Sequence, residues 1–106
     1  MKPDKVLSVI GIAMKSGNVV SGEFSTEKAV RSKSAALVIV ASDASDNTKK
    51  KFRNMTDYYG VPLHFYSDKE TLGHYIGKQF RAALAVTDEG LARSIEDKLM
   101  KMLTTE

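Results

Sequence analysis

Apolar residues along the chain follow two spacings in turn, one typical of helices and one typical of strands. Spacings of three and four residues predict helices over residues 4–16, 25–33, 46–59, 67–77 and 87–102. Short aliphatic runs predict strands over 19–20, 37–41, 63–66 and 82–86. The run 37–41 has no polar residue, which is typical of a central strand covered on both faces. Because these elements alternate with short connections, we expect an α/β fold: a three-layer α/β/α sandwich around a small mixed sheet of about four strands.

Polar residues precede the predicted helices and are expected to cap them, because their side-chain oxygens can accept hydrogen bonds from the first backbone N–H groups. The expected caps are Asp4, Ser25, Ser45, Ser67 and Thr87. The apolar stripes of the last two helices are expected to bury Tyr75 and Met102.

The composition indicates one globular domain spanning residues 1–106, with 42% hydrophobic and 27% charged residues. The apolar runs are far shorter than the roughly 20 residues that cross a bilayer, so we expect a cytoplasmic protein that does not enter the membrane. The chain has no cysteine, and its two histidines, His64 and His74, lie on different predicted elements. We therefore expect no metal site, no cofactor and no catalytic residues.

The net charge of +3 is distributed unevenly along the chain. Residues 1–56 hold ten basic and five acidic side chains, whereas residues 57–106 hold six basic and eight acidic ones. If the basic residues of the first half share a face, that face would attract a polyanion such as a nucleic acid. The alternative is an ordinary solvated surface that is rich in lysine.

Two segments have the composition of a nucleic-acid contact. Gly22 forms a turn before the second predicted helix, whose free N–H groups favour an anion, and Lys28 and Arg31 share one face of that helix. Phe80 lies between polar and basic residues in the loop before the last strand, a composition suited to stacking on a base. The alternatives are that Gly22 is only a turn, Ser25 only a cap, and Phe80 a core residue.

A resemblance to a known family rests on several separated segments that occur in order and at matching spacing. They read SGNVVSGE (16–23), KAV (28–30), LVIVASDAS (37–45), NTKK (47–50), YYGVP (58–62), LG (72–73) and IGK (76–78). Together they resemble the bacterial branch of the L7Ae ribosomal protein superfamily, and in particular its small YlxQ-type proteins. The resemblance covers nearly the whole chain and implies the same three-layer sandwich.

The resemblance also implies a function, because better-studied members of the superfamily bind kink-turn RNA, a sharply bent duplex with tandem sheared G·A pairs. Their recognition element reads Gly-x-Asn-Glu-x-x-Lys, assisted by the loop before the last strand. Gly22 and Lys28 match its first and last positions, while Phe24 and Ser25 stand where Asn and Glu are expected. The expected RNA-binding residues are Gly22, Glu23, Phe24, Ser25, Lys28, Arg31, Lys78, Gln79, Phe80 and Arg81.

The sequence therefore predicts a monomeric, non-enzymatic protein that binds kink-turn or related structured RNA and contacts the ribosome. The first alternative is a module that has lost RNA binding and docks a translation or transcription factor through the same loops. A large exposed apolar patch around Phe24 and Phe80 would favour it. The second alternative is a small enzyme, for which the sequence offers no motif.

Overall fold

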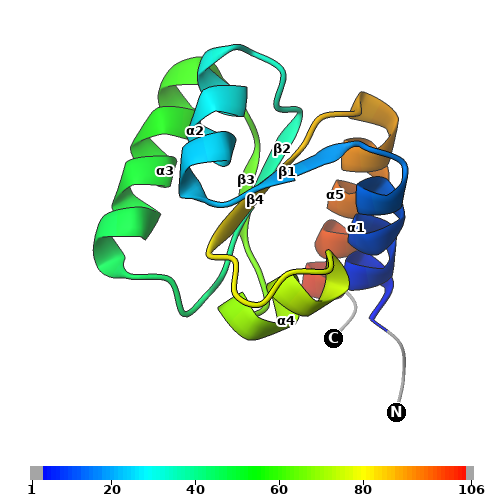
Figure 1. Ribbon diagram of the computed structural model, residues 1–106. Coiled ribbons are helices and arrows are strands. Elements are labelled where there is room, and N and C mark those ends of the chain that lie inside the picture. Colours follow the sequence, from blue (N-terminus) through cyan, green and yellow to red (C-terminus); the bar gives the residue numbers. More distant parts are fainter. Residues whose placement is uncertain (1–3, 105–106) are drawn as a thin grey trace.

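Five helices and four strands alternate in the computed structural model, which describes residues 4–104 of the expected domain (Figure 1). The ends of the chain, 1–3 and 105–106, lie outside the described residues. The helices are α1 (Lys5–Lys15), α2 (Glu23–Arg31), α3 (Asp46–Tyr59), α4 (Lys69–Tyr75) and α5 (Glu89–Thr104). The strands are β1 (Val19–Ser21), β2 (Leu37–Val40), β3 (Leu63–Phe65) and β4 (Ala83–Val86).

The strands form one mixed sheet in the order β1-β4-β2-β3. Strand β2 pairs in parallel with β3, whereas β4 runs antiparallel to both of its neighbours, β1 and β2. Every residue of β2 and β4 is buried, as expected for central strands. Figure 1 shows α2 and α3 over one face of the sheet, and α1 and α5 over the other. The predicted three-layer sandwich is therefore confirmed.

The two faces of the sheet contribute side chains to two separate hydrophobic cores, because successive side chains of a strand point to opposite sides. Leu37 and Ile39 of β2 pack with residues of α1, α4 and α5, whereas Val38 and Val40 pack with residues of α2 and α3. Phe52 of α3 is the largest fully buried side chain. It fixes α3, and with it the side chains that α3 presents to α2.

Three of the five predicted helix caps are wrong by one to three residues. Helix α2 begins at Glu23 with Gly22 as its N-cap, because the chain turns sharply at this glycine and enters the helix at once, leaving Ser25 in the first turn. Helix α4 is capped by Asp68 instead of Ser67, whose φ of 63° departs from the extended backbone usual for an N-cap. At α5 the carboxylate of Asp88, one residue beyond Thr87, accepts the bond from Leu91 N at 2.8 Å.

The predicted caps Asp4 and Ser45 are confirmed, each accepting a bond from the backbone N–H three residues on. Two buried positions were wrongly predicted. Tyr75 is exposed because α4 ends there and Ile76 enters the core in its place. Met102 is exposed because the buried stripe of α5 reaches Leu99 and goes no further among the described side chains.

Candidate nucleic-acid interface

The expected recognition segments meet at one end of the sheet. Because β4 is antiparallel to β1, the loop before β4 lies beside the turn that follows β1. Arg81 Nε donates a hydrogen bond to Ser21 Oγ at 3.1 Å, across 60 residues of sequence. The backbone N–H of Gly22 donates to the carbonyl of Ala83 at 2.9 Å. These two bonds join the β1–α2 turn and the loop 78–81 into one surface.

Gly22 adopts a backbone conformation that side chains disfavour, with φ 91° and ψ 156°. A Cβ at this position would meet no atom within 4 Å, so the glycine is required by the backbone conformation and not by lack of space. The carbonyl of Gly22 accepts the bond from Thr26 N at 3.0 Å and so begins α2, but the residue has no side chain to cap the first N–H groups. An anion is therefore favoured at this helix end.

The loop 78–81 is held against α4 at both of its ends. Lys78 N donates to the carbonyl of Gly73 at 2.8 Å, and Arg81 N donates to the carbonyl of Lys69 at 3.0 Å. A Cβ on Gly73 would lie only 2.4 Å from the carbonyl oxygen of Gln79, so the loop requires a glycine beneath it. Phe80, 60% exposed, is presented to solvent by this fixed loop.

A second group of expected residues lies along the outer face of α2. Phe24, Lys28 and Arg31 are all exposed, and with Glu27 and Ser32 they line a groove of 410 Å³. Within the described part of the chain, the ammonium group of Lys28 has no ion-pair partner. This face therefore offers an aromatic ring and positive charge to solvent.

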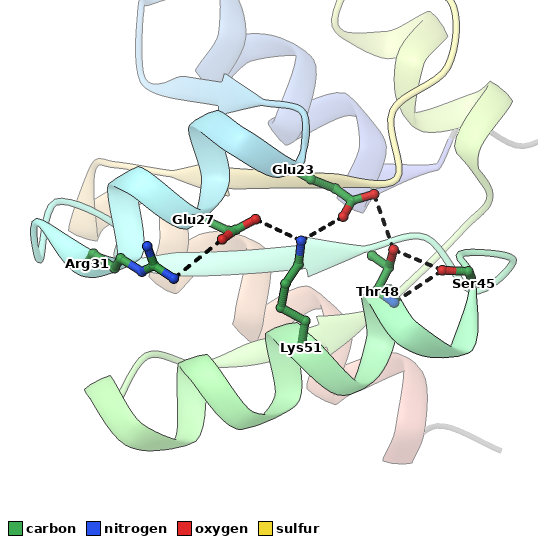
Figure 2. A network of polar contacts seen from close by, with 6 residues as sticks. All are labelled: Glu23, Glu27, Arg31, Ser45, Thr48 and Lys51. Atoms are coloured by element: carbon green, nitrogen blue, oxygen red, sulfur yellow. Dashed lines mark hydrogen bonds and ion pairs between the residues drawn. The ribbon is translucent and has the colours of Figure 1, made fainter.

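The acidic side chains of α2 are held by α3, as Figure 2 shows. Lys51 Nζ lies 2.9 Å from Glu23 Oε1 and 2.7 Å from Glu27 Oε2. Thr48 Oγ1 donates to the other carboxylate oxygen of Glu23 at 3.2 Å, and Arg31 Nη2 lies 3.6 Å from Glu27. We call Glu23, Glu27, Lys51 and Thr48 the α2–α3 network. It directs Glu23 toward α3, where its charge is balanced.

The contacts of the network also shift the pKa values of Glu23 and Lys51. The hydrogen bond from Lys51 is the main cause that lowers the pKa of the Glu23 carboxyl below its ordinary value. The hydrogen bonds to Glu27 and Glu23 raise the pKa of Lys51 above its ordinary value. At neutral pH Glu23 and Lys51 are therefore charged, and the single positive charge of Lys51 offsets part of the negative charge that the carboxylates of α2 present to a polyanion.

Residues 4–96 match the ribosomal protein L7Ae/L30e/S12e/Gadd45 family. The chain belongs to this family. RNA-binding protein YlxQ of Bacillus subtilis is 40% identical over 87 residues, 82% of this chain and 87% of that protein. The Enterococcus faecium protein of the same name is 36% identical over 93 residues, 88% of this chain and 89% of that protein. The family resemblance expected from the separated sequence segments is thus confirmed.

Relatives of the L7Ae/L30e/S12e/Gadd45 family also include large ribosomal subunit protein eL30B of Schizosaccharomyces pombe, 36% identical over 82% of this chain and 76% of that protein. A solved structure, a protein with unknown function from Bacillus halodurans C, matches with a TM-score of 0.89 and 33% identity over 92% of this chain and 99% of that one. The Giardia lamblia 15.5kD RNA binding protein matches with a TM-score of 0.77 over 98% of this chain and 92% of that one, at 19% identity, and shows the shared fold.

The residues expected to bind RNA fall into two adjoining parts. We call Gly22, Ser25 and residues 78–81 the turn–loop surface, and Phe24, Lys28 and Arg31 the α2 outer face. Arg31 lies about 10 Å along the helix from Phe24, well away from the turn. Glu23 belongs to the α2–α3 network. The sequence patterns did not identify Ser21, Lys51 and Gly73 as residues that shape the site. The partners of Ser21 and Lys51 lie far along the chain. Gly73 contacts a loop whose path the sequence does not reveal.

Among residues 4–104, no group of three or more histidine, aspartate or glutamate side chains could hold a metal ion. His64 Nε2 lies 3.0 Å from Glu96 Oε2, but this pair supplies too few ligands for a structural metal site. No helix in this part of the chain is long and apolar enough to cross a membrane.

Proposed function

We propose that this chain binds structured RNA through the turn–loop surface and the adjoining Lys28 of the α2 outer face. We propose further that it catalyses no reaction and that kink-turn RNA is its target. The observation that carries the proposal is the bond from Arg81 to Ser21, because it joins the two expected recognition segments. The names of the Bacillus subtilis and Enterococcus faecium relatives, both RNA-binding proteins, support it. We further propose that the protein acts as a cytoplasmic monomer that contacts ribosomal RNA.

The turn–loop surface and the adjoining Lys28 each have a role in this proposal. The backbone of Gly22 and the first turn of α2 approach a phosphate, since the helix end attracts anions and no side chain stands in the way. Lys28 contacts a phosphate or the O6 and N7 acceptors of a guanine. Phe80 packs on an exposed base or ribose.

Gel-shift titrations with a kink-turn RNA and an unkinked duplex test the proposal. We expect tighter binding of the kink-turn and, for about four phosphate contacts, a slope of log affinity against log salt of roughly −3 to −4. Lys28→Gln should weaken binding. Lys15→Gln is the matched control, because Lys15 is also exposed and lies at the end of α1, before β1 begins. Equal affinity for both RNAs, unchanged in Lys28→Gln, would overturn the proposal.

A protein-docking function on the same surface is the second candidate. The observation that favours it is the exposure of two phenyl rings, Phe24 at 79% and Phe80 at 60%. Isolation of the protein from cells, followed by sequencing of the bound RNA, separates the two functions. Enrichment of particular structured RNAs supports RNA binding. A partner protein that still copurifies after ribonuclease treatment supports docking.

A further inference from the structure

The α2 outer face carries one aromatic side chain and two cations in a line. Phe24, Lys28 and Arg31 are spaced four and three residues apart, so they share one side of the helix. They rise along the axis by about 6 Å and then by about 4.5 Å. Phe24 is 79% exposed, and its ring has no aromatic or cationic partner within residues 4–104.

The groove along this face is suited to an anion although Glu27 is among its lining residues. The Glu27 carboxylate lies 2.7 Å from Lys51 Nζ and 3.6 Å from Arg31 Nη2, so its negative charge is already balanced. Lys28 has no such partner in the described chain, and the guanidinium of Arg31 keeps further donors for a ligand. The groove therefore combines an apolar end at Phe24 with a net positive end.

We propose that the α2 outer face binds an unpaired segment of RNA, in which one base stacks on Phe24 while neighbouring phosphates contact Lys28 and Arg31. This inference rests on the proposed RNA binding and adds the class of nucleotide that the site takes. Every base has a π-face that an exposed aromatic ring can cover, and stacking needs no hydrogen-bond donor. The base must be unpaired, because a base inside a duplex is stacked on its neighbours.

This occupant fits Phe24, which stands at the asparagine position of the recognition element that the family resemblance implies. A phenyl ring cannot make the directional base-edge contacts of the asparagine expected there, but it can stack. RNA is favoured over a protein partner because the two cations at helical spacing complement successive phosphates, and the one carboxylate nearby is balanced. An apolar protein segment would cover the ring but leave Lys28 without a counter-charge.

The test uses kink-turn RNA labelled with 2-aminopurine, an adenine analogue whose fluorescence is quenched by stacking. The label is placed in turn at each unpaired nucleotide and, as a control, at a paired nucleotide of a stem. The variants are Phe24→Leu, which keeps an apolar side chain without a π-face, and the matched control Tyr58→Leu. Tyr58 is an aromatic residue of α3 that is 82% exposed. Both changes are at the surface, so both variants should fold.

We expect the wild-type protein to quench at least one unpaired position. Phe24→Leu should lose that quenching and bind about 5- to 150-fold more weakly, while Tyr58→Leu keeps both properties. If Phe24→Leu quenches and binds like the wild type, this inference is wrong and the proposed RNA binding stands. If Phe24→Leu weakens binding but leaves quenching unchanged, Phe24 does not stack, and the inference is equally overturned. If the wild type binds no RNA, both proposals fail.

Discussion

Replacing Lys51 with methionine would remove the positive charge at the centre of the α2–α3 network while keeping most of the side-chain volume. Lys51, Glu23 and Glu27 are 37%, 41% and 22% exposed, so solvent screens both ion pairs and each contributes at most about 1 kcal/mol. The variant also leaves Glu23 and Glu27 facing each other one helical turn apart, a like-charge pair that costs about 0.2 to 0.5 kcal/mol. We therefore expect Lys51→Met to lower the free energy of unfolding by about 1 to 2 kcal/mol.

Thermal and urea unfolding followed by circular dichroism measure this loss. For a chain of this length, about 1 to 2 kcal/mol corresponds to a fall in Tm of about 5 to 9 °C. Lys50→Met is the control, because the neighbouring Lys50 is exposed and has no partner in the described chain, so its loss should cost less than about 0.5 kcal/mol. In a Glu27→Gln background, Lys51→Met should cost less than it does in the wild type, since one of the two pairs is already gone.

The charge origin of the loss can be checked with salt and pH. The difference between wild type and Lys51→Met should shrink at about 1 M salt, where the Debye length is about 3 Å. The pKa of Glu23 is lowered in the folded protein, so its stabilisation is present above its ordinary pKa and is lost as the pH falls through the folded value. The pKa of Lys51 is raised, so its stabilisation is lost as the pH rises past its ordinary value and through the folded one. A difference that persists at high salt and at low pH would refute the electrostatic reasoning and assign the effect to packing of the alkyl chain.

Three further predictions follow from single contacts. Gly73→Ala should lower the free energy of unfolding by about 1 to 3 kcal/mol and weaken RNA binding, because the new Cβ would meet the Gln79 carbonyl. An unchanged Tm would contradict this and show that the loop adjusts freely. Burial and the hydrogen bond to Asp4 Oδ2 at 2.6 Å raise the pKa of Tyr66. The stability that the Tyr66 hydroxyl provides should therefore decline as the pH rises above about 10. Tyr66→Phe should not show this decline when unfolding is measured across alkaline pH. Phe52→Ala should cost about 3 to 5 kcal/mol in urea unfolding, and a loss below about 1 kcal/mol would contradict the packing described for α3.

Much of the fold could be predicted from local patterns. The polar-free run that includes β2 (37–40) predicted a central strand, and the helical stripe of α3 predicted that Phe52 is buried; both depend only on the spacing of apolar residues. Two of the three wrong caps, those of α4 and α5, arose where neighbouring residues compete for one role. Ser67 and Asp68 are both good caps, and only the path of the backbone, with Ser67 at positive φ, decides between them.

The candidate site also depends partly on local sequence and partly on tertiary contacts. The sequence by itself determined the kinds of side chain available, an aromatic ring and cations in the second helix and an aromatic ring in the last loop, and its separated segments determined the family. Only the tertiary structure decided which of them meet. The bond from Arg81 to Ser21 spans 60 residues, and the pairs of Lys51 with Glu23 and Glu27 span 28 and 24. No local pattern encodes these contacts, because they follow from the insertion of β4 between β1 and β2 and from the packing of α3 beside α2.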